Sequence, residues 1–435
     1  MVYNCVTNIF HVNCKYRYIK NCKGGSDFIM KKPDIVILGA GYGGIMTAVK
    51  LQKMLNMNEA VITLVNKYDY HYQTTWLHEN AAGTLHHDRT RIPIKDVVNL
   101  DRVNFVMDTV ISIKPDKKKI KLENGELYYD ILVIGLGFET ATFGIPGLKE
   151  NAFTIENINS ARLIRDHLEY NFAMYQHEDE KNPGRLNIVV GGGGITGVEY
   201  LGELANRIPE LCEEYDIYKT MVRIINIEGE SAVLPGFDPQ LTEYAMSSLE
   251  SRGVEFITGG IVKECKPDCI VYEKEGKETA IPTYTTVWTG GVRANSIVEE
   301  SGFEHNHGKI EVRPDLRAPG YDDVFAIGDC ALIMDGKTNI PYPSTAQIAV
   351  QQSETAAHNI KALVQGTEEL GEFKPSLLGT VASLGNSDAI GDIFNNRKLF
   401  GWKAVIMKKI IDNRYLLKLG GFSLLMRKGK FNIFY

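Results

Sequence analysis

No apolar run in this 435-residue chain reaches the roughly 18 to 20 residues that a transmembrane helix needs. Residues 1–29 also lack the continuous apolar stretch and the small-residue cleavage site of a secretory signal. A net charge of −6 argues against general nucleic-acid binding. The absences exclude a membrane-spanning helix, whereas the length, 44% hydrophobic residues and 41 glycines fit an α/β protein of two or three domains.

Cysteines are few and poorly spaced for redox or metal chemistry. Seven occur, of which Cys212, Cys265, Cys269 and Cys330 lie in the body of the chain. Cys265 and Cys269 lack both the C-x-x-C spacing of a dithiol and the partners of a zinc site. We therefore expect a reduced protein without disulfides.

The chain also lacks a complete set of metal ligands. His86, His87 and Asp88 are adjacent, but no fourth ligand follows at a useful spacing. We interpret these residues as a surface loop and assign no metal.

The first positive signal is a strand, a glycine turn and a helix at residues 35–50. Four aliphatic residues, 35–38, predict a strand buried on both faces. In the G-x-G-x-x-G turn that follows, Gly39 permits the sharp bend, Gly41 lets the backbone approach a pyrophosphate, and Gly44 lets the helix pack closely. Gly43 belongs to the same turn, so the expected ligand is a dinucleotide.

A second strand is predicted at 61–66 and ends at Asn66, where a dinucleotide site usually has an acid that holds the ribose. An amide can both accept and donate, so adenosine binding remains possible but is signalled less firmly.

The same unit occurs again. A strand at 186–190 leads into a turn with Gly192, Gly194, Thr196 and Gly197, then a helix at 198–208 and a strand ending at Glu228. This acid can accept from both ribose hydroxyls of NADH and repels the 2′-phosphate of NADPH, which predicts a preference for NADH. Two complete fingerprints predict two dinucleotides and electron transfer between them.

Three further apolar strands end in glycine turns. They run from 130 to Gly137, from 286 to Gly290, and from 324 to Asp329, whose carboxylate is placed for a polyol hydroxyl or for capping the next turn. A hairpin is predicted before the first of them, with an Asn-Gly turn at 124–125.

Together these motifs resemble the two-dinucleotide flavoproteins. Within that superfamily, residues 194–199 (GITGVE), residues 346–351 (AQIAVQ) and the basic, apolar C-terminus are similar to bacterial type II NADH:quinone oxidoreductases, over essentially 32–435. The resemblance implies an α/β fold with two Rossmann-like dinucleotide-binding domains, for FAD and NADH, the second inserted in the first, and a C-terminal membrane-associating helical segment.

The resemblance also implies the activity. It is a respiratory transfer of hydride from NADH to noncovalent FAD, followed by two-electron reduction of a membrane quinone, expected to be menaquinone, without proton pumping. The implied setting is peripheral, at the cytoplasmic face of the cell membrane, and the implied assembly is a homodimer.

Site residues follow from the same resemblance. The A-Q-x-A-x-Q motif, here with Ala346, Gln347 and Gln351, is implied to line the quinone site beside the flavin. From spacing alone, the two glutamines share one helix face, which is also typical of an ordinary polar surface. Glu199 is implied near the nicotinamide and quinone entrances, although a glutamate in a first helical turn is also favoured by the helix dipole. Lys408 is implied near the quinone.

One residue departs from the family pattern. Ile195 stands where the family more often has Phe, which removes aromatic packing at the second turn. The change bears on the detail of the nicotinamide site.

The C-terminal segment has a charge opposite to that of the rest of the chain. Residues 397–435 contain ten Lys and Arg against Asp412 alone, a net charge of +9 that leaves −15 elsewhere. Basic residues interleaved with apolar ones predict helices lying in an anionic lipid surface, and a basic surface without membrane contact is the alternative.

The sequence predicts five successive regions. They are a non-native or disordered leader (1–29), the first FAD-binding segment (30–150), the NADH-binding domain (151–300), the second FAD-binding segment with the quinone-site helix (301–390), and the membrane-anchoring segment (391–435).

Two other functions remain open. A thiol-linked flavoprotein, such as a sulfide:quinone oxidoreductase or disulfide reductase, shares the fold, but residues 51–76 after the first fingerprint contain no redox cysteine. A non-catalytic NADH sensor is the other alternative, and steady-state turnover distinguishes it.

Overall fold

The computed structural model describes residues 31–335, 340–367, 369–394 and 397–431. The leader predicted at 1–29 lies outside the described residues.

A parallel sheet of five strands carries the first glycine turn. Its order is β21 (Val324–Ala326), β9 (Ile131–Ile134), β1 (Asp34–Leu38), β2 (Val61–Asn66) and β5 (Val103–Met107). The central strand β1 pairs with β2 and β9, and residues 35–38 are buried as the aliphatic run predicts. Because β21 joins β9 from far along the chain, this domain is built from two segments.

A second parallel sheet repeats this arrangement. Its order is β11 (Phe153–Thr154), β18 (Thr285–Trp288), β12 (Asn187–Gly191), β13 (Arg223–Glu228) and β14 (Val254–Thr258). All of its strands fall between β9 and β21 in sequence. The predicted fold of two Rossmann-like units, the second inserted in the first, is confirmed, while the residue boundaries of the domains stay predictions.

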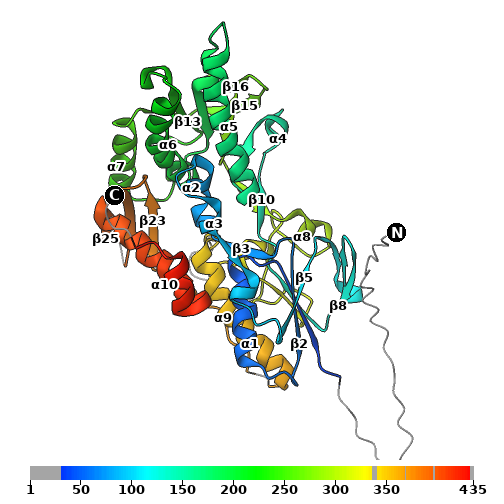
Figure 1. Cartoon of the computed structure of the whole chain (residues 1–435). Coiled ribbons are helices and arrows are strands. Elements are labelled where there is room, and N and C mark those ends of the chain that lie inside the picture. Colours follow the sequence, from blue (N-terminus) through cyan, green and yellow to red (C-terminus); the bar gives the residue numbers. More distant parts are fainter. Residues whose placement is uncertain (1–30, 336–339, 368, 395–396, 432–435) are drawn as a thin grey trace, which may run out of the picture. The chain divides into compact units, whose positions relative to one another are not determined.

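Helices follow each glycine turn and cover the sheets. In the first domain α1 (Tyr42–Met54) packs along α9 (Ala346–Gln365), visible as the blue and yellow helices of Figure 1. In the second, α6 (Ile195–Glu214) follows the turn and contacts α5 (Ile158–His177), α7 (Pro239–Glu250) and α2 (Leu77–Ala82). Shorter helices are α3 (His87–Thr90), α4 (Leu148–Asn151) and α8 (Ser296–Glu300).

Small sheets complete both domains. The predicted hairpin is present as β7 (Lys119–Leu122) and β8 (Gly125–Tyr128), joined by β6 (Val110–Lys114). Its counterpart comprises β15 (Ile261–Cys265), β16 (Cys269–Lys274) and β17 (Lys277–Pro282). Two further two-stranded sheets are the antiparallel pair of β10 (Phe138–Thr140) with β19 (Val292–Ala294) and the parallel pair of β20 (Ile310–Glu311) with β22 (Ala331–Leu332).

Residues 68–76, which show no period in the sequence, are nevertheless ordered. β3 (Tyr70–Tyr72) pairs antiparallel with β4 (Arg91–Pro93), and a 3₁₀ turn over Thr74–Trp76 leads into α2. Three residues are too few for an alternating pattern, which is why the sequence carries no strand signal here.

The C-terminal region is a three-stranded sheet followed by one long helix. The strands are β23 (Gly379–Ser383), β24 (Ala389–Ile393) and β25 (Arg397–Phe400), and α10 (Trp402–Lys428), red in Figure 1, contacts all three. The helix breaks at Gly421, whose φ of 69° and ψ of −164° are not helical. Among the residues that the structure describes, every helix is too short or too polar to cross a bilayer.

Candidate functional site

The first glycine turn is shaped for close approach of a phosphate. Gly39 has φ +92°, and a Cβ there would lie 2.3 Å from the Gly135 carbonyl oxygen. A Cβ on Gly44 would lie 1.9 Å from the Gly39 oxygen, so helix and strand pack as the motif predicts. In front of Gly41, the N-cap of α1, there is open space. Uncapped amides at a helix N-terminus beside open space fit the pyrophosphate of a dinucleotide.

The second turn has the same construction. Gly192 has φ +104° and a Cβ there would lie 2.5 Å from Gly290 Cα, while one on Gly197 would lie 2.2 Å from the Gly192 oxygen. The space before Gly194, the N-cap of α6, is open, and Thr196 is exposed in the first helical turn. Gly290 therefore lies directly against this turn, because the glycine at position 192 lets the two backbones approach so closely.

Asn66 and Glu228 occupy equivalent positions but hold different groups. Asn66 Oδ1 accepts from the Ala40 amide at 2.9 Å, and its Nδ2 donates to the Tyr68 carbonyl at 2.8 Å. Glu228 accepts from the Gly193 amide through one oxygen and from the Glu230 amide, at 2.8 Å, through the other. The side-chain amide of Asn66 thus links the first turn to the segment that follows β2. An uncharged amide can make both bonds because it has a donor and an acceptor.

Three remaining candidates surround the 3₁₀ turn Gly328–Cys330 that follows β21. Asp329 is half-buried in this turn, and its pKa is raised by burial. Gly137 has φ +78° with open space where a side chain would lie, and Ala346 begins α9. No local sequence pattern marks Gln352, whose Oε1 accepts from the Gly328 amide at 2.6 Å and so fixes the Asp329 turn.

The two glutamines of α9 do lie on one helix face, as their spacing of four predicts. Both donate from Nε2 to the backbone oxygen of Ser376, at 2.7 Å from Gln347 and 3.0 Å from Gln351. Gln351 Oε1 also accepts from the Ser376 amide at 2.8 Å. A peptide carbonyl between two amide donors occupies the geometry that a quinone carbonyl would require.

Glu199 and Lys408 meet although 209 residues separate them. Lys408 Nζ lies 2.5 Å from Glu199 Oε1, with side chains 16% and 5% exposed. Burial alone would lower the pKa of Lys408, but the carboxylates of Glu199 and Asp412 raise it above its usual value, so the ammonium stays charged. Glu199 also accepts from the Ser383 amide at 3.1 Å.

A wider group of buried polar residues adjoins this pair. His78 Nδ1 lies 3.4 Å from Glu199 Oε2, and burial lowers the pKa of His78 to about 3, so this ring is neutral. Trp76 Nε1 donates to Asp412 Oδ2 at 2.8 Å, and Thr84 donates to Glu203. Sequence reasoning missed all of these except Glu199, since only contacts between distant segments bring them together.

His71 connects the first glycine turn to α10. Its Nδ1 donates to the Ala40 carbonyl at 2.8 Å, and its Nε2 accepts from the Tyr415 hydroxyl at 2.9 Å. Burial lowers the pKa of His71 to about 4, and the neutral ring suits one donor and one acceptor. His71 thus ties the first glycine turn to α10.

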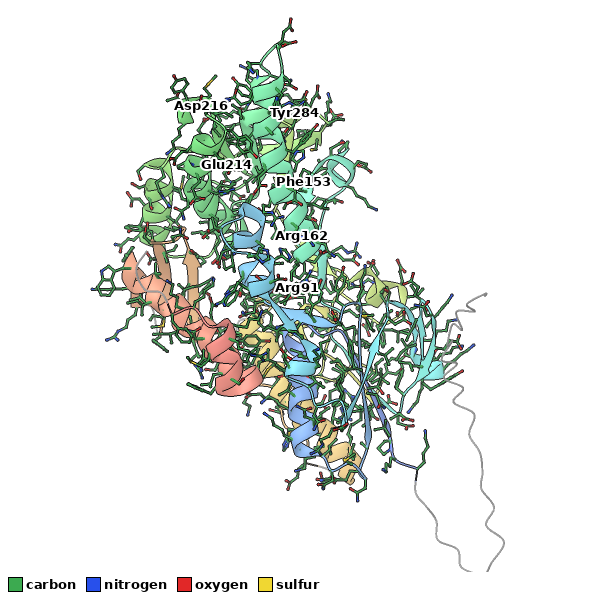
Figure 2. All side chains as sticks on the ribbon, viewed as in Figure 1. Arg91, Phe153, Arg162, Glu214, Asp216 and Tyr284 are labelled. Carbon is green, nitrogen blue, oxygen red and sulfur yellow. The ribbon has the colours of Figure 1, made fainter. Side chains whose placement is uncertain are left out.

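His86, His87 and Asp88 offer ligand atoms within 4.8 Å of one another. Cationic groups also face them: Arg91, labelled in Figure 2, lies 3.6 Å from an Asp88 oxygen, and Lys428 donates to the Asp88 carbonyl at 2.5 Å. Burial and the neighbouring His86 lower the pKa of His87. A cationic environment opposes a metal ion, so we assign no metal role to this group.

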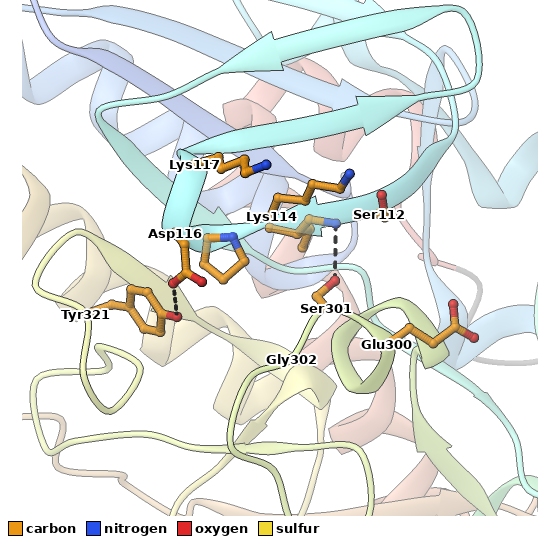
Figure 3. Close-up of a pocket in the computed structure, with 10 residues that line it drawn as sticks. Ser112, Lys114, Asp116, Lys117, Glu300, Ser301, Gly302 and Tyr321 are labelled. Atoms are coloured by element: carbon orange, nitrogen blue, oxygen red, sulfur yellow. Dashed lines mark hydrogen bonds between the residues drawn. The ribbon is translucent and has the colours of Figure 1, made fainter.

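A cavity of about 370 Å³ lies elsewhere in the first domain, between β6 and α8 (Figure 3). Its walls are held by bonds from the Ile113 amide to Ser301 and from the Tyr321 hydroxyl to Asp116. None of the residues expected to bind a dinucleotide or quinone lines it.

The cysteines are placed poorly for thiol chemistry. Cys265 and Cys269 end β15 and begin β16 in the second domain, and burial raises the pKa of each. Cys330 lies in the turn with Asp329, where burial raises its pKa to about 12 and its thiol lies 3.5 Å from the Gly137 carbonyl. A thiol with so high a pKa is not a ready nucleophile.

Known proteins resemble the chain over most of its length. The profile of the pyridine nucleotide-disulphide oxidoreductase family matches residues 33–353. A type II NADH:quinone oxidoreductase of Staphylococcus aureus is 44% identical over 397 residues, which cover 91% of this chain and 98% of that protein.

Solved structures share the fold at lower identity. NDH2 of Plasmodium falciparum in complex with NADH matches with a TM-score of 0.81 at 19% identity, over 92% of this chain and 98% of that one. The sulfide:quinone oxidoreductase of Aquifex aeolicus matches with a TM-score of 0.73 at 22% identity, over 89% and 91%. At these sequence identities, the two structural matches support the fold assignment alone.

Proposed function

The chain belongs to the type II NADH:quinone oxidoreductases of the pyridine nucleotide-disulphide oxidoreductase family, and from this membership we propose how its own residues serve the reaction. It is an enzyme that oxidises NADH and reduces a quinone, with a flavin as cofactor. The observation that carries the assignment is 44% identity to the S. aureus enzyme over 91% of the chain.

FAD is held noncovalently by the first domain. The amides of Gly41 and of the first turn of α1 would receive the pyrophosphate, and Asp329 would accept from a hydroxyl of the ribityl chain. The fit rests on the open space at Gly41 and Gly137. The cofactor supplies a two-electron carrier that takes hydride from NADH and passes electrons to quinone.

NADH is held by the second domain. Its pyrophosphate meets the N-terminus of α6 at Gly194, and Glu228 accepts from the adenosine ribose. A carboxylate at this point disfavours NADPH, because it repels the 2′-phosphate.

The quinone site lies at the start of α9. Gln347 and Gln351 donate to one quinone carbonyl, which takes the place that the Ser376 carbonyl holds in this structure. The Ser376 peptide must leave for this exchange, so the loop carrying it gates the site. Leu377 and Leu378 follow it, exposed by 56% and 37%, and present an apolar edge to an isoprenoid substrate.

Glu199 and Lys408 serve the proton balance of the reaction. Hydride carries two electrons and one proton, so quinol formation takes one further proton from water. Lys408 pairs with Glu199 and orients it within a buried site, from which the carboxylate can relay that proton to the quinone.

The thiol-linked alternative finds no support in the positions of the cysteines. It needs a reactive thiol beside the flavin, and Cys330, the cysteine of the Asp329 turn, has a pKa of about 12. The sensor alternative predicts no turnover and is tested by the same assay as the main proposal.

We further propose that α10 attaches the enzyme to an anionic membrane surface, with menaquinone as the acceptor. Its exposed apolar side chains include Trp402, Ile410 and Phe422, interleaved with basic residues. The cytoplasmic face and the homodimer are implied by family resemblance, and light scattering of the detergent-solubilised enzyme measures the latter.

Anaerobic flavin absorbance tests the electron path. NADH is expected to bleach the visible absorbance band of the flavin, and a short-chain menaquinone is expected to restore it. Gln351→Ala should slow the second step about tenfold or more, as removal of a site donor does, and leave the first unchanged. Equal slowing of both steps would remove Gln351 from the quinone site, and absence of recovery in the wild type would refute quinone as acceptor.

A further inference from the structure

The chain folds back on itself after the break in α10. Asn413 Nδ2 donates to the Lys430 carbonyl at 3.0 Å, and the Lys430 amide donates to Asn413 Oδ1 at 2.9 Å. Arg89 donates to the Arg427 carbonyl at 3.0 Å and to the Gly429 carbonyl at 3.2 Å. These bonds fix the segment beyond the helix against both α10 and α3.

The returning segment places the side chain of Lys430 beside α2. Lys430 forms an ion pair with Glu79, with the two side chains 20% and 16% exposed. Its ammonium also lies 4.1 Å from the centre of the Trp76 ring, within the range of a cation–π contact. Because Trp76 donates to Asp412, Lys430 adjoins the same polar group as the Glu199–Lys408 pair.

Acids and bases are equal in number in this group. Its charged side chains come from α2, α6, α10, the turn after α7 and the returning segment. They are Glu79, Glu199, Glu203, Asp412, Arg252, Lys408, Lys409 and Lys430, beside the neutral His78. Arg252 also faces Asp388, outside this group. Four carboxylates therefore share three ammonium groups and one guanidinium that has a further acid beside it, so the loss of any one cation changes the charge of the whole buried group.

We propose that Lys430 is a positioning residue, which by pairing with Glu79 and lying over the Trp76 ring sets the charge balance of the buried carboxylates around Glu199. The aspect of this inference that concerns quinone turnover rests on the function proposed above. Three observations support the inference: the ion pair with Glu79, the cation–π contact with Trp76, and the hydrogen bonds that hold the returning segment against α10.

The direction of the effect follows from the signs of the charges. Burial and the charge of Glu79 raise the pKa of Glu203 to about 7, whereas Lys430 lowers it. Removing the Lys430 charge should therefore raise the pKa of Glu203 further, and removing the Glu79 charge should lower it. Removing both should return it toward its starting value, a compensation that a merely structural role does not predict.

Infrared pH titration of the holoenzyme tests the proposal without any quinone. The band of the protonated carboxyl is assigned to Glu203 by its loss in Glu203→Gln. Lys430→Met should raise the midpoint by about one pH unit, Glu79→Gln should lower it by about one, and the double variant should lie near the wild type. Lys403→Met, which removes an exposed charge near the start of α10, should leave the midpoint unchanged.

Several outcomes would overturn the inference. The inference fails if the titration midpoints of Lys430→Met and Glu79→Gln both shift in the same direction. It also fails if the midpoint of Lys430→Met stays at the wild-type value, as that of Lys403→Met is expected to do. If Lys430→Met does not fold, Lys430→Arg and Glu79→Gln decide: the wild-type midpoint in the first and a lowered midpoint in the second support the proposal, and any other pair of results contradicts it.

The pH dependence of turnover extends the test to the reaction. The alkaline limb of quinone reduction should move in the same direction as the infrared midpoint in each variant. If the wild type fails to reduce quinone, the proposed function fails while the infrared result still decides on Lys430. If turnover is normal but its pH profile stays fixed, the charge balance set by Lys430 does not govern the reaction.

Discussion

At the scale of single residues, His71 and His78 are buried as neutral rings, 1% and 2% exposed. Burial lowers their pKa to about 4 and about 3, whereas an unfolded chain binds a proton at about 6.5. Between these values the unfolded state holds more protons, so stability falls as pH drops below about 6.5. The linkage amounts to about 2 kcal/mol for each ring at pH 5.

His71→Asn should weaken this pH dependence. Asparagine retains a donor for the Ala40 carbonyl but does not titrate, so the fall in melting temperature between about pH 7 and about pH 5 should be shallower than in the wild type. Thermal melts with excess FAD measure it. His86→Gln, at a ring whose side chain is 61% exposed, is the matched control and should keep the wild-type slope. Parallel curves for wild type and His71→Asn would show that His71 is not buried neutral.

Glu228 is the residue on which cofactor choice is predicted to depend. Glu228→Gln keeps an acceptor oxygen for one of the two amides, of Gly193 or Glu230, and removes the charge that repels a 2′-phosphate. The ratio of kcat/KM for NADH to that for NADPH should fall about tenfold or more, corresponding to about 1.4 kcal/mol. Glu230→Gln, an exposed neighbour, is the control. An unchanged ratio would place the discrimination elsewhere.

At the scale of elements, α10 depends on the break at Gly421. Its φ of 69° and ψ of −164° fall in a region that essentially only glycine adopts, and the space around it is open. A side chain here would strain the backbone without meeting a neighbour. The break lets the chain turn back and bring Lys430 to Glu79.

Gly421→Ala should therefore loosen the returning segment. The strain amounts to about 1–3 kcal/mol, which should speed hydrogen exchange of residues 422–430 by about tenfold to a hundredfold. Ser423→Ala, at an exposed position of the same helix, is the control. Exchange that remains as slow as in the control would mean that the segment is held without the break.

The elements also show what a sequence can and cannot predict. Both strand–turn–helix units were predictable, because the aliphatic run before Gly39 and the glycine spacing are local signals. Spacing also placed Gln347 and Gln351 on one face, but nothing local named Ser376 as their partner. Lys430 and Glu79 lie 351 positions apart, and a lysine in a basic segment carries no mark of the one carboxylate it meets.

At the scale of the whole molecule, charge is divided unevenly. The net charge of −6 combines +9 in residues 397–435 with −15 in the remainder. On α10 the exposed apolar side chains include Trp402, Leu417, Phe422 and Met426, exposed by 58%, 48%, 69% and 57%. We expect an anionic lipid surface to attract the basic segment and to repel the acidic remainder, which would orient the enzyme with α10 toward the membrane.

Vesicle co-sedimentation separates the electrostatic and apolar contributions to this attraction. The holoenzyme should bind vesicles that contain an anionic lipid more tightly than purely zwitterionic ones. Raising salt from about 0.1 M to about 1 M should weaken binding, because the Debye length falls from about 10 Å to about 3 Å.

Phe422→Ser should lower the binding that survives high salt, because that contribution comes from buried apolar area. Phe143→Ser, at a 71% exposed aromatic in the first domain, removes a comparable side chain away from α10 and should bind as the wild type does. Binding that ignores both lipid charge and salt would refute the electrostatic orientation, and equal losses in the two variants would refute α10 as the attaching element.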